Sequence, residues 1–321
     1  MAKLRIAVVG AGQFGLNHMR VVGQSERAEL TAVVDADPAR AAEAAGRFGC
    51  PAMRLEELPG RVEAAVVAVP TSAHAEVGCA LIEQGIDVLV EKPIAPDLAS
   101  AARLIEAAKA HGRILQVGHL ERFNPAVTAL KEVRTLPLFF EVHRMSVFTP
   151  RSLDVDVVLD LMIHDLDIVL DLVGEEPEEI RAAGIKILSH KVDIANVRLA
   201  FPGGCVANLT ASRVSTERVR KLRVFQPGQY VSVDYARQDG AVFEVGKPGG
   251  IGFRPLSVAK GEPLQLELEH FFEAVATRKR PLVAGEEAGR ALEVALAILG
   301  RIEEHSHRVA ESIAAHRVQR G

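Results

Sequence analysis

The sequence predicts an α/β protein in which a doubly wound parallel sheet is followed by an α+β domain with an open antiparallel sheet. Three observations support this prediction. Strand and helix signals alternate up to about residue 120, which is typical of a parallel sheet wound by helices. A glycine-rich turn links the first strand to the first helix. After about residue 137, strands with alternating apolar and polar residues dominate, as in an antiparallel sheet.

Length and composition limit the possible architectures and partners. A chain of 321 residues is too long for one ordinary core, so two domains are expected, 1–120 and 121–321, with the last helices able to pack back on the first. A net charge of −4 gives no reason to expect a nucleic-acid or membrane partner. The first strand begins almost at Met1 and the three cysteines are isolated, which favours a cytoplasmic protein without disulfides.

The first strand, residues 3–9, runs into a turn with the spacing G-x-G-x-x-G and then into an amphipathic helix. Glycines at these positions allow a tight turn, close approach of a pyrophosphate, and close packing of helix on strand. The free N–H groups of the helix start would face the phosphates. The pattern predicts a Rossmann-type dinucleotide site held by Gly10, Gly12, Gln13, Phe14 and Gly15.

The second strand, residues 29–34, ends at Asp35, where an acid binds the ribose 2′-hydroxyl of NAD. Asp37 follows, and a 2′-phosphate would meet both carboxylates, so NAD is favoured over NADP. Arg40 is expected to lie exposed in the first turn of the next helix, residues 38–48.

Three further strands complete the first sheet, at residues 64–69, 86–90 and 113–118, with helices at 75–84 and 100–111. The second of these strands leads directly into Glu91-Lys92-Pro93, at the strand end where open α/β sheets bind ligands. A lysine there suits a catalytic or ligand-holding role, although a plain strand end is an alternative. The residues expected to line the cofactor site are Pro70, Thr71, His74, Glu91 and Lys92.

The second domain should contain a strand at 138–148, a helix at 155–173, strands through 180–245, a loop at 246–252 and helices at 264–278 and 285–309. On its first helix, Asp160, His164 and Asp167 share one face, whereas Asp165 should be exposed. A carboxylate one turn before a histidine can orient an imidazole that acts as a base. A core histidine is the alternative, and the pair supplies too few ligands for a metal, so none is expected.

The glycine turn, the Glu91-Lys92-Pro93 triplet and the Asp160/His164 pair together resemble the glucose–fructose oxidoreductase / inositol dehydrogenase family over the whole chain. The resemblance implies that Lys92, Asp160 and His164 are catalytic, that NAD is the cofactor and that the bond before Pro93 is cis. It also implies a homodimer or homotetramer joined through the second sheet, where Asn208, Thr210 and Ser212 are candidate contacts. Met162 stands where the family often has glycine, which would reshape the pocket floor.

Two shorter segments, residues 118–125 and 159–165, resemble UDP-N-acetylglucosamine 3-dehydrogenases, which make a 3-keto nucleotide sugar used toward lipid A. This implies a nucleotide-sugar substrate contacted by Arg122, Asn124 and His164. Arg144 and the basic run at 213–223 offer further cations for its diphosphate, although most of that run is typical of a solvated strand edge.

The expected chemistry is oxidation of a secondary sugar hydroxyl. Histidine has an ordinary pKa of about 6.5, which suits His164 as the base. Lys92 would favour the developing alkoxide, and Asp160 would hold the imidazole tautomer. The alternatives are an inositol or free-sugar dehydrogenase, an enzyme that keeps its NAD between turnovers, and a non-catalytic NAD(H) sensor.

Overall fold

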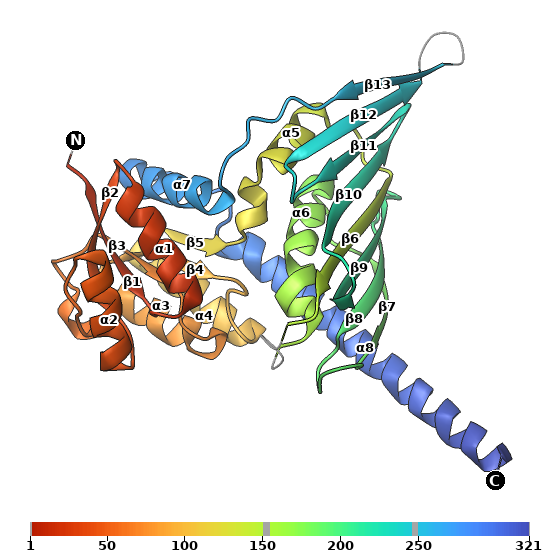
Figure 1. Ribbon diagram of the computed structural model, residues 1–321, viewed down its shortest axis with the longest axis horizontal. Helices are drawn as coiled ribbons and strands as arrows, with labels where there is room; N and C mark the ends of the chain where they lie inside the picture. The colour runs from red at the N-terminus through yellow and green to blue at the C-terminus, as the bar shows by residue number, and fades with distance from the viewer. Residues whose placement is uncertain (1, 150–154, 246–249, 321) are drawn as a thin grey trace. The chain divides into compact units, whose positions relative to one another are not determined.

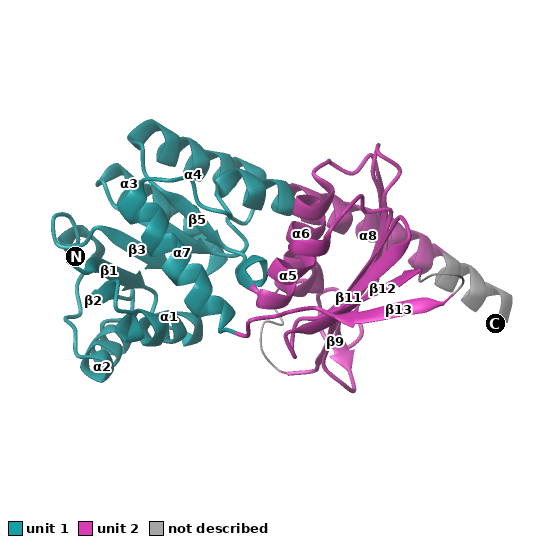
Figure 2. Ribbon diagram, turned by 90° about the horizontal axis from the view of Figure 1, so that it is seen from above, with its two compact units in different colours: residues 1–123, 261–292 teal, residues 124–260, 293–321 magenta. Residues whose placement is uncertain are grey.

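The computed structural model describes residues 2–149, 155–245 and 250–320, and for 312–320 it describes the backbone alone. The chain forms two compact units, coloured separately in Figure 2. The first contains residues 1–123 and 261–292, and the second contains residues 124–260 and 293–321. A segment from late in the sequence therefore completes the N-terminal unit.

The sheet of the first unit has five parallel strands in the order β2-β1-β3-β4-β5 (Figure 1). Its strands are β1 (Leu4–Val9), β2 (Ala28–Val34), β3 (Ala64–Val67), β4 (Asp87–Glu91) and β5 (Leu115–Gly118). A single parallel bridge from Val33 to Ala52 extends the sheet beyond β2. The apolar runs of β3 and β4 are completely buried, as expected for strands covered on both faces.

Helices cover both faces of this sheet. They are α1 (Gln13–Gln24), α2 (Pro38–Phe48), α3 (His74–Glu83), α4 (Leu98–His111) and α7 (Pro263–Thr277), with 3₁₀ turns η1 (Leu55–Glu57), η2 (Thr71–Ala73) and η3 (Leu120–Phe123). Residues of α1, α2 and α7 share one apolar core with the strands. The pair α3 and α4 lies across the sheet from α7 in Figure 1. The doubly wound parallel sheet that the sequence predicts is confirmed.

The sheet of the second unit has eight strands in the order β13-β12-β11-β10-β6-β9-β8-β7. They are β6 (Phe139–Val147), β7 (Glu179–Ile185), β8 (Ile194–Ala200), β9 (Val206–Ser215), β10 (Val219–Gln226), β11 (Gln229–Asp234), β12 (Asp239–Val245) and β13 (Ile251–Pro255). Neighbouring strands are antiparallel except for the parallel pair β6 and β9. Its helices are α5 (Pro125–Val133) and α6 (Ile163–Val173), together with the part of α8 (Gly285–Arg320) that follows residue 292.

Three local details differ from the sequence-based expectation. The helix α5 was not predicted at all. The helix expected over 155–173 begins instead with a π turn, η4 (Val158–Met162), and becomes α-helical at Ile163. Residues 246–249 of the expected loop lie outside the described residues, and Ile251 already belongs to β13. In the part of the chain that the structure describes, no helix combines the length and apolarity needed to cross a bilayer.

Candidate active site

The glycine turn after β1 has the geometry of a phosphate cradle. Gly10 has a φ of +104°, and a Cβ there would overlap the carbonyl of Ala68, so only glycine fits. A Cβ on Gly15 would likewise overlap the carbonyl of Gly10. A Cβ on Gly12 would meet no atom within 4 Å, and this residue caps α1 without a side-chain hydrogen bond. The start of α1 is therefore open to an anion, which fits a dinucleotide pyrophosphate.

Asp35 closes the cofactor turn from β2. Its carboxylate accepts hydrogen bonds from the backbone N–H of Ala11 (2.7 Å) and of Asp37 (2.8 Å), and from the Arg40 guanidinium (3.0 Å). Burial opposes ionisation, but these hydrogen bonds hold the pKa of Asp35 below its usual value. Arg40 is exposed as expected, yet it also pairs with the two acids, while Asp37 caps α2. The sequence did not predict this cation–acid pairing.

Beyond β3, Pro70 is exposed, Thr71 is partly buried and His74 begins α3. The His74 ring is buried, with Nδ1 2.9 Å from the Pro93 carbonyl oxygen and Nε2 3.0 Å from the Val69 carbonyl oxygen. Burial lowers the pKa of His74 despite these acceptors, so a neutral ring donates to one of them at a time. His74 thus joins the end of β3 to the segment after β4.

Glu91 and Lys92 lie at the carboxyl end of β4, and the bond between Lys92 and Pro93 is cis as the resemblance implies. Glu91 is buried and accepts hydrogen bonds from Nε2 of His18 on α1 (2.7 Å) and from the Lys92 backbone N–H (3.2 Å). Burial opposes ionisation, but His18 and then Lys92 hold the pKa of Glu91 below its usual value. Glu91 is therefore a buried carboxylate that holds the backbone of Lys92.

His119 lies beside Lys92 and was not predicted as a site residue. In the parallel register Glu91 is opposite Gly118, so the residues that follow them, Lys92 and His119, leave the sheet side by side. Burial, and then the charges of Lys92 and Arg122, lower the pKa of His119 to about 3, so its ring is neutral at physiological pH. A Cβ on Gly118 would lie 3.1 Å from Oε2 of Glu91, which explains the glycine before it. The sequence signal that could have identified His119 is the Gly118-His119 pair at the end of a predicted strand.

The two substrate contacts expected near residue 122 are both buried. Arg122 is 3 % exposed, within η3. The Oδ1 atom of Asn124 accepts from the Ala126 backbone N–H (3.1 Å) and caps α5, while its Nδ2 donates to the Tyr235 carbonyl (3.2 Å). Both polar ends of the Asn124 side chain thus bind the protein's own backbone, which gives this residue a structural role at the start of α5.

The expected acid–histidine pair lies where the π turn η4 joins α6. Asp160 is half-buried within η4, and His164 is 8 % exposed in the first turn of α6. Asp167 is buried further along α6. Because a π turn holds more residues than an α turn, a spacing of four falls short of a full turn at this point. Single π turns often mark functional sites, and this one carries Asp160.

The expectation that Asp165 is exposed is wrong. Asp165 is 2 % exposed and accepts two hydrogen bonds from Arg144 of β6, at 2.7 Å from Nε and 2.8 Å from a terminal nitrogen. Arg144 also lies over the Tyr235 ring. This bidentate pair fixes α6 beside His164, so Arg144 serves Asp165 and not, as expected, a diphosphate. Met162 is fully buried in the core and not exposed at a pocket floor.

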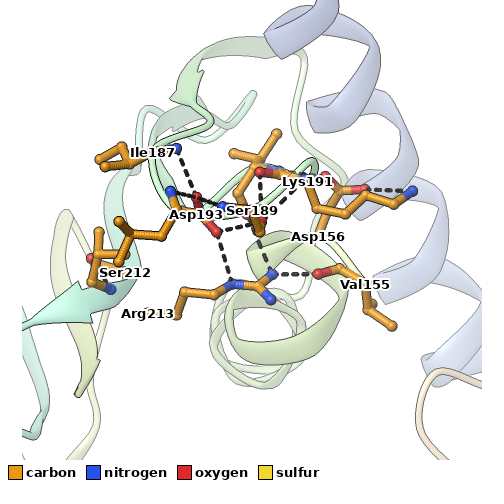
Figure 3. A network of polar contacts seen from close by, with 11 residues as sticks. Val155, Asp156, Ile187, Ser189, Lys191, Asp193, Ser212 and Arg213 are labelled. Carbon is orange, nitrogen blue, oxygen red and sulfur yellow. Dashed lines mark hydrogen bonds and ion pairs between the residues drawn. The ribbon is translucent and has the colours of Figure 1, made fainter. Parts of the chain in front are cut away.

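A second buried ion pair anchors the chain just before η4 (Figure 3). Asp193 accepts hydrogen bonds from the backbone N–H groups of residues 187–189 and from the Ser189 hydroxyl (2.6 Å). Arg213 lies 3.6 Å from Asp193 and also donates to the carbonyls of Val155 and Val192. These contacts tie the connection between β7 and β8 to the segment that leads into Asp160. They also occupy the Arg213 guanidinium with partners inside the protein.

Among the described residues, no group of three or more His, Cys, Asp or Glu side chains is arranged to hold a metal ion. The side chains that could take part in a reaction are Glu91, Lys92 and His119 in the first unit, and Asp160 and His164 in the second.

Comparison with known proteins identifies the relatives of both units. Residues 4–119 match the family model described as "Oxidoreductase family, NAD-binding Rossmann fold". Residues 131–226 match the GFO/IDH/MocA C-terminal domain.

Full-length relatives are also found. A UDP-N-acetylglucosamine 3-dehydrogenase of Acidithiobacillus ferrooxidans is 34% identical over 94% of this chain and 98% of its own. The solved structure of that enzyme matches with a TM-score of 0.90, covering 95% of this chain and 99% of its own. The scyllo-inositol 2-dehydrogenase (NAD(+)) of Bacillus subtilis is 28% identical over 92% of this chain and 93% of its own.

Proposed function

The chain belongs to the Gfo/Idh/MocA family of NAD-binding oxidoreductases, and on this premise we propose that it oxidises C3 of UDP-N-acetylglucosamine to the 3-keto sugar. The family acts on sugar and inositol hydroxyls, and NAD is its cofactor. A 3-keto nucleotide sugar is a substrate for amino transfer, which agrees with a use toward the diamino sugar of lipid A.

One observation carries the choice of substrate. The UDP-N-acetylglucosamine enzyme is similar over nearly the whole chain at 34% identity, including the domain expected to bind substrate. Inositol dehydrogenases of similar identity match only about half of the chain, as in the 38% identity over 54% for one from Saccharopolyspora erythraea. Over most of the chain, the inositol dehydrogenase of Rhizobium meliloti is 26% identical. At similar identity, the nucleotide-sugar enzyme therefore aligns with more of the chain than this inositol dehydrogenase does.

The residues proposed to hold the cofactor surround the glycine turn and the ends of β2, β3 and β4. NAD, when bound, supplies the hydride acceptor. The open start of α1 would bind its pyrophosphate, and Asp35 would accept from the ribose hydroxyl. The proposed set is Gly10, Gly12, Gln13, Phe14, Gly15, Asp35, Pro70, Thr71, His74, Glu91 and Lys92.

The catalytic roles are proposed for three side chains. His164 accepts the proton of the sugar hydroxyl, since a positioned imidazole suits proton transfer near neutral pH. Lys92 stabilises the alkoxide that develops on the same oxygen. Asp160 positions the imidazole. The proposed role of Lys92 is supported by the hydrogen bond from its backbone N–H to Glu91, because this bond fixes the lysine beside a buried carboxylate.

The choice of arginines proposed to contact the diphosphate changes once their partners in the structure are known. Arg144 and Arg213 each bind a buried aspartate, and Arg223 pairs with Glu141. We therefore place the phosphate contacts at Arg122 and Arg220. Arg220 is opposite Arg144 in the antiparallel register, so the two side chains leave the same face of the sheet.

Association of copies through the second sheet is part of the proposal. Of the polar contacts expected on β9, Asn208 and Thr210 are half-buried, whereas Ser212 is 3 % exposed and unsuited to a contact. A row of aromatic rings crosses neighbouring strands instead. It comprises Phe139, Phe225, Tyr230, Phe243 and Phe253, with ring centroids 4.5–5.7 Å apart. Phe253 is 65 % exposed, so this row is the better candidate for a homodimer or homotetramer contact.

The test is NADH formation with UDP-N-acetylglucosamine, other UDP-sugars, inositols and free hexoses, with thermal stability measured in parallel. We expect UDP-N-acetylglucosamine to be favoured in kcat/KM by about 100-fold over myo-inositol. At about 100 times its Kd, a true ligand should add roughly 2.7 kcal/mol of stability. Preference for an inositol would contradict the substrate. Stabilisation by NAD without turnover of any sugar would favour a non-catalytic sensor. Stoichiometric NAD(H) in the purified protein would favour an enzyme that retains its cofactor between turnovers.

A further inference from the structure

His18 is a buried polar ring on the side of α1 that faces the sheet. It lies three residues after Gly15, which packs against the glycine turn, and four before Val22, which is fully buried, so the three share one helical face. The His18 side chain is only 1 % exposed. A polar ring in such surroundings destabilises the fold unless a hydrogen-bond partner is supplied.

That partner is the Glu91 carboxylate at the carboxyl end of β4. Nε2 of His18 lies 2.7 Å from Oε1 of Glu91, whose side chain is 10 % exposed. Because β3 lies between β1 and β4 in the sheet, this contact joins the helix that follows β1 to a strand two places away. The helix whose start forms the proposed pyrophosphate site is thereby tied to the strand that leads into Lys92.

The two ring nitrogens of His18 have different surroundings, which decides where its proton lies. Nδ1 is buried and has no hydrogen-bond partner among the residues that the structure describes, whereas Nε2 faces a carboxylate, which only accepts. A proton on Nδ1 alone would be buried without an acceptor and would set the Nε2 lone pair against the carboxylate. His18 therefore donates from Nε2 to Glu91.

The second oxygen of Glu91 reaches the backbone of the lysine. Oε2 accepts from the Lys92 backbone N–H at 3.2 Å. Gly118 of β5 sets the space for this carboxylate, because a Cβ there would lie 3.1 Å from Oε2. With Oε1 held by His18, the carboxylate presents Oε2 to the Lys92 backbone.

We propose that His18 is a positioning residue for Lys92: its Nε2–H holds Glu91 so that the second carboxylate oxygen fixes the backbone from which the lysine side chain extends. The inference rests on the proposed catalytic role of Lys92. A displacement of about 1 Å at a reacting group can cost about 100-fold in rate. A contact that fixes the lysine backbone therefore affects turnover without touching the substrate.

The first arm of the test uses neither substrate nor cofactor. Nitrogen-15 spectra of the wild-type protein labelled at histidine should show a proton on Nε2 of His18, whose signal is the one lost in His18→Gln. In protein labelled at lysine, the Lys92 backbone amide should exchange with solvent about tenfold faster in His18→Leu than in wild type, because its Glu91 acceptor is no longer held. A wild-type His18 with its proton on Nδ1 alone, or an unchanged exchange rate in His18→Leu, would overturn the proposal.

The second arm measures kcat and the Kd of NAD, with a sugar that the wild-type enzyme oxidises. His18→Leu removes the donor and should lower kcat about 10–100-fold with NAD affinity nearly unchanged. His18→Gln should recover most of the turnover, since its amide nitrogen can take the place of Nε2. An equal loss of kcat in both variants would show that the hydrogen bond does not position the lysine.

Val22→Ala is the matched control, because it removes core packing from the same face of α1 and leaves His18 in place. It should lower thermal stability while the Lys92 exchange rate and kcat stay near their wild-type values. A loss of kcat in Val22→Ala as large as in His18→Leu would make His18 an ordinary packing residue. Wild-type turnover in Lys92→Met would contradict the catalytic role of the lysine, whereas the first arm decides separately whether His18 fixes its backbone.

Discussion

The carboxylate of Asp35 and the guanidinium of Arg40 lie 3.0 Å apart at the end of β2. The same carboxylate also accepts from the Ala11 backbone, inside the glycine turn. The acid that would exclude a 2′-phosphate therefore also pairs with a neighbouring cation that could attract one. Cofactor preference at this site depends on both residues.

Asp35→Ala should weaken NAD binding and reduce the preference over NADP, because it removes the ribose acceptor and releases Arg40 toward a 2′-phosphate. Titration of both dinucleotides into the variant measures the change. Asp97→Ala removes another acid, the N-cap of α4, and should leave both Kd values unchanged. Tighter NADP than NAD binding by the wild-type protein would contradict this view of Asp35.

His164→Ala should lower kcat by about 10²–10⁴ with nearly unchanged NAD affinity, since the base acts on the substrate proton. Asp160→Asn should have a smaller effect in the same direction. Steady-state kinetics and NAD titration separate the two quantities. A normal kcat with a raised KM in His164→Ala would reassign the residue to substrate binding.

Lys92→Met should lower kcat and kcat/KM together, because the ammonium group acts mainly on charge that develops in the transition state. Lys92→Arg should not restore turnover, since the planar guanidinium cannot place a compact charge in the same space. Both variants should still bind NAD through the glycine turn. Turnover near the wild-type value in Lys92→Met would leave this segment as a structural strand end.

Asp165→Ala should destabilise the protein by about 3–5 kcal/mol in denaturant unfolding, because it leaves the Arg144 guanidinium buried without its carboxylate. The double variant Arg144→Met with Asp165→Leu should recover most of that loss, since no charge remains buried. If Asp165→Ala unfolds at the wild-type denaturant concentration, the pair is not a structural anchor of α6.

The acid stability of the second unit should depend on Asp193. Burial opposes ionisation, but the hydrogen bonds from Ser189 and the backbone of residues 187–189 lower the pKa of Asp193 from 3.8 to about 2. A group whose pKa is lower in the folded state stabilises the fold above its unfolded pKa and loses that contribution as pH falls toward its folded pKa. The wild-type protein should therefore lose about 2 kcal/mol between pH 5 and pH 2 through this group.

Unfolding free energies of wild type and Asp193→Asn across that pH range measure the contribution. The variant should be less stable at pH 7, and the difference should shrink as the pH falls from 4 to 2. A difference that stays constant over this range would show that the charge of Asp193 is not the stabilising feature.

The sequence by itself determined the parallel sheet, its glycine turn, the acid at the end of β2 and the position of Lys92 at the end of β4. These features depend on local signals: apolar runs that mark buried strands, and glycines that alone fit a turn such as the one at Gly10. The strand and helix order of the first sheet was predictable for the same reason, whereas α5 and the π turn before His164 were not predicted.

Only the tertiary structure decided which charged side chains are buried and with which partners. Helical spacing alone suggested an exposed Asp165, but β6 brings Arg144 against it. The sequence likewise did not show that Asn124 caps α5 and donates to the Tyr235 carbonyl, since the two residues are far apart along the chain. The cost of burying a polar group is set by the partners that distant segments supply, and no local pattern in the sequence records them.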